Sequence, residues 1–141
     1  MRNTLEHGFY AALLLLLICI PTIAAEQFPF DQDLLLDASP MRPGKRMPML
    51  NVEPGGNARI DLWCRTVPAH IEVSDTTIKV EAGPLPDGMP EMMSAGQCTP
   101  ERMQADEEML ATLNQVTGWR RQGDEVVLEG AQTLKFRLSD H

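Results

Sequence analysis

The cysteines are the residues of this chain whose chemistry can be judged most directly from their positions. Cys64 and Cys98 are the two that lie outside the N-terminal apolar segment, which holds Cys19. In an oxidising compartment two such cysteines most often pair, and closing a loop of this length would stabilise the fold by roughly 3.5–4 kcal/mol. Neither belongs to a Cys-x-x-Cys motif or has a histidine beside it. We therefore expect a disulfide, and a small thiol-dependent enzyme stays open as an alternative.

Methionine is the second residue type with chemistry of its own. Met89, Met92 and Met93 fall in the stretch from Pro84 to Gln97, whose prolines and glycines indicate a long loop. Thioethers bind Cu(I), so a soft-metal or oxidant-handling protein is an alternative function. More often methionine fills irregular gaps or forms adaptable contact surfaces. We therefore assign no metal ligand, and expect these methionines and an exposed Trp63 to form a binding surface.

Histidines and carboxylates do not form a recognisable catalytic set. The histidines are His7, His70 and His141, and with His7 in the expected signal peptide a histidine-based site would have only His70 and His141 available. The run from Asp106 to Glu108 is typical of the solvated face of a helix. No glycine-rich phosphate loop is present. No catalytic residue and no cofactor can be assigned, so we expect a protein that is not an enzyme.

The charge balance limits the partners. The chain of 141 residues carries 12 basic and 20 acidic residues, for a formal net charge of −8. Nucleic acid binding requires clustered lysine and arginine to neutralise phosphates, so nucleic acid is not expected as a partner. The expected partner is an envelope protein or a small ligand, and neither can be identified from composition.

The N-terminus has the layout of a secretory signal peptide. A short polar head precedes the apolar run from Phe9 to Ile20, and small residues follow Pro21 up to Ala25. Cleavage is expected after Ala24 or Ala25. The run is too short to span about 30 Å of hydrocarbon comfortably as a helix, so no membrane span is expected after cleavage. This pattern predicts a periplasmic or secreted protein.

One helix and several strands must position these residues. Thr99 suits an N-cap and Pro100 a first turn, which predicts a helix over about 100–117, ended by Gly118. Its apolar face is expected to hold Met103, Leu110, Leu113 and Val116. A short apolar run predicts a strand at 34–36, and alternation and turn signals predict strands near 47–52, 58–64, 67–73, 77–81, 119–121, 125–129 and 134–138. In the third of these, Cys64 would face the core and Trp63 the solvent.

An ordered set of motifs resembles the META domain (HslJ-like) family of secreted and envelope proteins. The motifs are Leu62-Trp63-Cys64, Gly83-Pro84-Leu85, Cys98-Thr99-Pro100, the helix residues Leu110, Leu113 and Val116 with Trp119, then Gly123-Asp124 with Val126, Leu128 and Gly130, and finally Leu134 with Phe136. The resemblance implies a small single-domain α+β fold, in which a curved antiparallel sheet packs around the helix at about 100–117. The expected organisation is a cleaved signal at 1–25, N-terminal strands and loops at 26–57, and the META-like core at 58–141. The family is associated with envelope stress, drug tolerance or, in some members, secretion and virulence, and brings no established catalytic residues.

Overall fold

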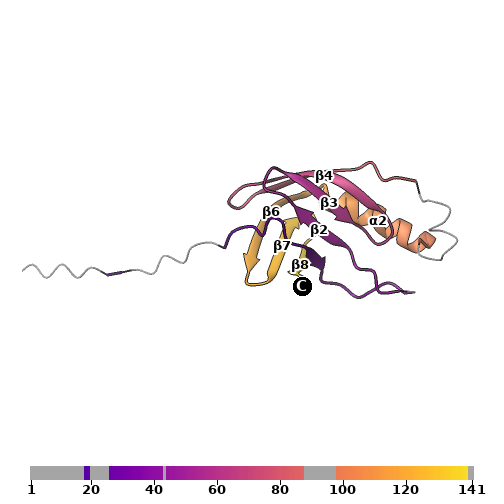
Figure 1. Cartoon of the computed structure of the whole chain (residues 1–141), viewed down its shortest axis with the longest axis horizontal. Coiled ribbons are helices and arrows are strands. Elements are labelled where there is room, and N and C mark those ends of the chain that lie inside the picture. The colour runs from indigo at the N-terminus through magenta and orange to yellow at the C-terminus, as the bar shows by residue number, and fades with distance from the viewer. Residues whose placement is uncertain (1–17, 20–25, 43, 88–97, 140–141) are drawn as a thin grey trace, which may run out of the picture.

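The computed structural model describes residues 18–19, 26–42, 44–87 and 98–139 (Figure 1). Within these ranges the chain forms eight strands and one helix. In chain order they are β1 (Leu34–Leu36), β2 (Met49–Val52), β3 (Asn57–Asp61), β4 (Thr66–Val73), β5 (Ile78–Ala82), α2 (Pro100–Leu113), β6 (Val116–Gln122), β7 (Glu125–Gly130) and β8 (Leu134–Leu138).

All eight strands belong to one antiparallel sheet that curls until its two end strands meet. The strand order is β5-β4-β3-β2-β1-β8-β7-β6, and β1 joins its two halves by pairing with both β2 and β8. The end strands β5 and β6 are connected by a bridge between Thr77 and Gly118. The backbone N–H of Trp119 also donates to the Thr76 carbonyl, at 3.1 Å. The result is a nearly closed barrel.

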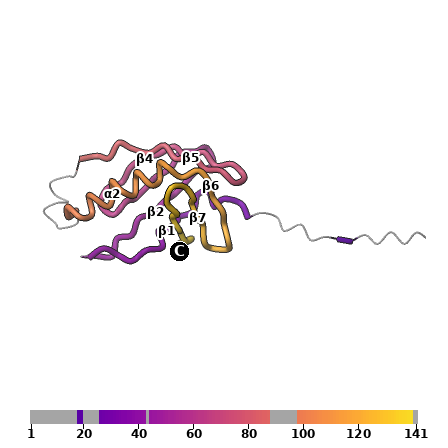
Figure 2. Tube along the Cα trace, turned by 180° about the vertical axis from the view of Figure 1, so that it is seen from behind, coloured from indigo at the N-terminus to yellow at the C-terminus, as the bar shows by residue number. Residues whose placement is uncertain are grey.

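The expected α+β fold, with a sheet packed around a helix, is therefore wrong. The molecule is mostly β, and its one described helix is a short element that contacts β5 at the side of the barrel (Figure 2). The reason is that β1 pairs with β8 and so joins the two halves of the sheet, and contacts between the end strands β5 and β6 then close the sheet on itself. A closed sheet buries its own inner face, so the helix covers only part of it.

The helix is also shorter than expected, because it ends at Leu113 and not near 117. Asn114 is the C-cap, and its side-chain amide pairs with the backbone of Ala82, accepting from N–H at 3.0 Å and donating to C=O at 3.3 Å. Val116 and Gly118 belong to β6. The start agrees with expectation, since the Thr99 hydroxyl accepts from the Arg102 N–H at 3.3 Å.

The inside of the barrel is filled by side chains. The inward positions of the strands and the buried face of α2 form one hydrophobic cluster. Its fully buried members include Leu34, Leu50, Val52, Ile60, Leu62, Val67, Leu113, Val126, Leu128 and Phe136. Small barrels are commonly packed in this way. A ligand of this protein is therefore expected to bind on the outside of the sheet.

Candidate functional site

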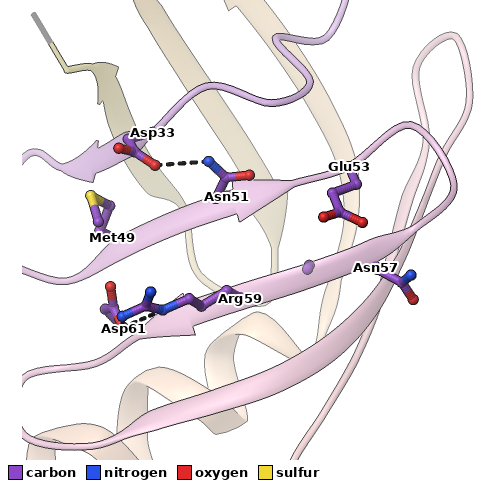
Figure 3. Close-up of a pocket in the computed structure, with 8 residues that line it drawn as sticks. Asp33, Met49, Asn51, Glu53, Asn57, Arg59 and Asp61 are labelled. Carbon is purple, nitrogen blue, oxygen red and sulfur yellow. Dashed lines mark hydrogen bonds and ion pairs between the residues drawn. The ribbon is translucent and has the colours of Figure 1, made fainter. Parts of the chain in front are cut away.

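A hollow of about 390 Å³ lies on the outer face of the sheet, over β2 and β3 and the residue before β1 (Figure 3). We call it the polar hollow. It is lined by Asp33, Met49, Asn51, Glu53, Asn57, Ala58, Arg59 and Asp61. Its volume is in the range of small-molecule sites, which usually run from about 300 to 1,000 Å³.

Strand register brings the lining side chains together. Leu50 and Val52 of β2 are fully buried inside the barrel, so Met49 and Asn51 between them point outward. Met49 stands directly opposite Asp61, and Asn51 opposite Arg59. Asn51, Arg59 and Asp61 thus sit on strands that are paired on both sides, which fixes their positions, and Asp33 and Glu53 lie just beyond the ends of β1 and β2.

Hydrogen bonds order two pairs of side chains in the polar hollow. The Asn51 amide donates to the Asp33 carboxylate at 2.8 Å, and the Arg59 Nε donates to the Asp61 Oδ1 at 3.1 Å (Figure 3). The Thr66 hydroxyl also donates to this Asp61 oxygen, at 2.6 Å. The Asp61 side chain is only 12% exposed, although it lies on an outer face. These contacts limit the side-chain freedom that a ligand would otherwise have to restrict.

The polar hollow has an excess of negative charge. Three carboxylates line it, those of Asp33, Glu53 and Asp61, against the one guanidinium of Arg59. This excess of carboxylates favours hydrogen-bond donors and positive charge in a ligand. Outside the polar hollow, on the outer face of β5, the hydrogen bond and charge of Glu81 raise the pKa of the exposed Lys79.

The two predicted disulfide cysteines lie at a different place, the corner that joins β3 to β4. Cys64 and Cys98 form the expected disulfide, with their Cα atoms 5.2 Å apart and both residues buried. Beside it, Asp106 of α2 is fully buried and accepts from the backbone N–H groups of Cys64 at 3.0 Å and Arg65 at 2.9 Å. This corner is a structural anchor for the helix.

Of the predicted binding surface, the structure describes Trp63 alone. Trp63 is 9% exposed and belongs to the hydrophobic cluster, so its expected exposure is wrong. The alternation that placed it outward ends with β3 at Asp61, before the chain bends. Met89, Met92 and Met93 lie outside the described residues, and so does the predicted signal peptide at 1–25 except for residues 18–19.

Sequence reasoning missed the residues of the polar hollow and the role of Asp106. The hollow follows from strand register, which local patterns do not give. Asp106 was expected on a solvated face, and that is wrong, because it is fully buried. A signal was available, since Asp106 lies three residues after Met103 and four before Leu110, on the apolar face of the helix.

His70 lies on β4 and is not among the residues that line the polar hollow. Its side chain is 48% exposed on β4, with Nε2 3.6 Å from a Glu72 carboxylate oxygen. Within the described ranges, no group of three or more histidines, cysteines, aspartates or glutamates is placed to hold a metal ion. The helix in the same ranges is neither long nor apolar enough to cross a membrane.

Comparison with known proteins agrees with the motif order. The family model described as the META domain matches residues 32–140, which covers β1 to β8. No curated protein and no solved structure matches the chain. The match extends over well over half of the sequence, and it includes both the polar hollow and the disulfide corner. The chain therefore belongs to the META domain family.

Proposed function

We propose that this protein is a non-catalytic binding module of the periplasm or the secreted space, and that its polar hollow is the binding site. The observation that carries the proposal is the contrast between a filled barrel and an ordered outer hollow. The interior cluster leaves binding to the outside, where Asn51, Asp33, Arg59 and Asp61 are held in place by hydrogen bonds. Preorganised polar groups of this kind favour binding because little freedom is lost.

Two further observations support the proposal. The buried disulfide fits an oxidising compartment such as the periplasm. The same bond engages both thiols, and a thiol enzyme would need one of them as a free thiolate. A role in envelope stress or drug tolerance is the process that we infer from membership of the family.

The test is a ligand titration followed by two-dimensional amide NMR of the exported protein. The probes are an alkylammonium, an alkyl sulfate, a neutral oligosaccharide and a basic peptide. We expect one class to shift the amide signals of β2 and β3 saturably. Asn51→Phe should abolish the shifts, because a large ring on the outer face fills the polar hollow without entering the core.

The matched control is Glu72→Phe, which places the same ring on the outer face of β4, away from the polar hollow. It should bind like the unchanged protein. The proposal fails if no probe shifts β2 and β3, or if Asn51→Phe binds as well as Glu72→Phe. In cells, a strain that lacks the protein should regain tolerance of envelope stress from Glu72→Phe and not from Asn51→Phe.

A further inference from the structure

A second hollow, of about 350 Å³, lies beside the polar hollow on the outer face of β1 and β8. We call it the apolar hollow. Its lining includes Leu35, Met47 and Leu138, with the Arg137–Asp37 ion pair at one side. Leu34 and Leu36 are in the core, and Leu35 between them faces outward and is only half-buried. A half-buried leucine on an outer face contributes little to the core and is available for contact.

Strand register joins the two hollows into one trough. Leu35, in the apolar hollow, stands directly opposite Met49, in the polar hollow. Asp33, just before β1, lines the polar hollow, and Leu35, two residues on, lines the apolar one; in the same way Met47, ahead of β2, lines the apolar hollow and Met49 the polar one. The trough therefore runs from polar to apolar lining without crossing to another face of the sheet.

The two ends of the trough attract different chemistry. At the polar end the charge excess is negative, and Arg59 is already engaged by Asp61. In the described part of the chain, no hydrogen bond or ion pair occupies the Glu53 side chain, which leaves its oxygens to accept from a ligand. The apolar end offers leucine and methionine side chains. A ligand that fits both ends carries a cationic N–H donor and an apolar chain.

The position of the trough favours a small molecule over a peptide strand. β1, β2 and β3 are interior strands, each hydrogen-bonded to a neighbour on both sides. A peptide that binds by extending a sheet needs an unpaired strand edge, and none lies under the trough. Binding must therefore come from side-chain contacts, and each hollow alone has the volume of a small-molecule site.

We propose that the trough binds a small cationic amphiphile, with its ammonium or guanidinium group over Glu53 and Asp33 and its alkyl chain over Leu35 and Met47. This inference rests on the proposed function and names its ligand class. The charge of the head group gives selectivity, and burial of the chain gives most of the affinity.

The test measures binding of decylammonium to the exported protein by calorimetry, below the micelle concentration, with amide NMR to locate it. Decyl sulfate has the same chain with the opposite charge, and butylammonium has the same head with a short chain. We expect decylammonium to bind at least about tenfold more tightly than either, because the carboxylates of the polar hollow repel decyl sulfate and because butylammonium has a shorter chain to bury. Amide shifts should appear in both β1 and β3.

Two variants test the two ends of the trough separately, and a third is the control. Glu53→Gln should weaken decylammonium about threefold, as expected for one exposed charge. Met47→Ser should weaken it by a similar factor through lost apolar contact and leave butylammonium unchanged. Glu107→Gln removes an exposed carboxylate of α2, far from the trough, and should change nothing.

The outcomes distinguish this inference from the proposed function. If decyl sulfate or an oligosaccharide shifts the β2 and β3 amides while decylammonium does not, the ligand class is wrong and the polar hollow remains a binding site. If no probe shifts these amides, both proposals fail. Equal binding of decylammonium to the unchanged protein, Glu53→Gln and Met47→Ser would overturn the assignment to the trough.

Discussion

Two arginine–aspartate pairs of the same length lie in very different surroundings. Arg65 and Asp106 approach to 3.1 Å at the disulfide corner, with side chains 7% and 0% exposed. Arg59 and Asp61 approach to 3.1 Å in the polar hollow, with side chains 69% and 12% exposed. The N···O distance does not distinguish the two pairs, but the exposure of the arginine does: Arg65 is buried with its partner, and Arg59 is open to solvent.

The buried pair is part of a network in which each group has several partners. Besides its bond to Asp106, the Arg65 guanidinium donates to the carbonyls of Met103 at 3.0 Å and Pro86 at 3.2 Å. Asp106 accepts three bonds from the segment around Cys64. The helix, the corner and the segment after β5 therefore depend on one carboxylate. The outer pair joins Asp61 to Arg59 and the Thr66 hydroxyl, on the neighbouring strands β3 and β4. Fewer parts of the fold depend on it, so the proposed ligand could replace one of these partners.

The largest expected effect is that of Asp106→Ala. It leaves the Arg65 charge and two backbone N–H groups buried without their acceptor, which should lower the free energy of unfolding by about 3–5 kcal/mol. Chemical denaturation of the purified protein measures this. Glu107→Ala, at the neighbouring exposed position, should stay within about 0.5 kcal/mol. Equal effects of the two variants would show that burial does not divide these carboxylates.

The second expected effect is loss of the disulfide. The double variant Cys64→Ala with Cys98→Ala should lose about 3–4 kcal/mol of unfolding free energy, mainly because the unfolded chain becomes less restricted. Asp106 still holds the corner in this variant, so the native amide spectrum of β2 and β3 should persist. Adding a reductant should destabilise the unchanged protein and leave the double variant as it was. A reductant effect on both would place its cause elsewhere.

The strands could be predicted from the sequence, and the closed barrel could not. Apolar runs and alternation are local properties: the run at Leu34 and the alternation around Ile71 and Phe136 placed strands close to their observed positions. The barrel needs the bridge between Thr77 and Gly118 to close, and it needs the pairing of Leu36 with Phe136, a hundred residues away in sequence, to join its two halves. Nothing in either segment specifies that partner, so the number of sheets and the role of the helix stayed undetermined.

The candidate site shows the same division. The disulfide was predictable because the expected signal peptide leaves two cysteines. The polar hollow was not, because Asp33, Asn51 and Arg59 gain their relation only when three strands align. The end of the helix at Leu113 was missed for a similar reason. Its C-cap residue, Asn114, accepts a hydrogen bond from the backbone N–H of Ala82, which lies on β5, far away in sequence. Long-range pairing decides each of these features.

The smallest expected effect is that of Arg59→Met, and it sharpens the comparison most. The variant removes the exposed partner of Asp61 while the Thr66 hydroxyl still donates to the same carboxylate. The free energy of unfolding should change by no more than about 0.5–1 kcal/mol, and the change should shrink in high salt, because exposed ion pairs are screened. Arg65→Met provides the matched loss at the buried pair, where a drop of about 3 kcal/mol or more is expected. If denaturation gave equal losses, the outer pair would be as structural as the buried one. The hydrogen bonds of the polar hollow would then stabilise the barrel itself. A ligand could bind Asp61 only by breaking contacts that the fold needs.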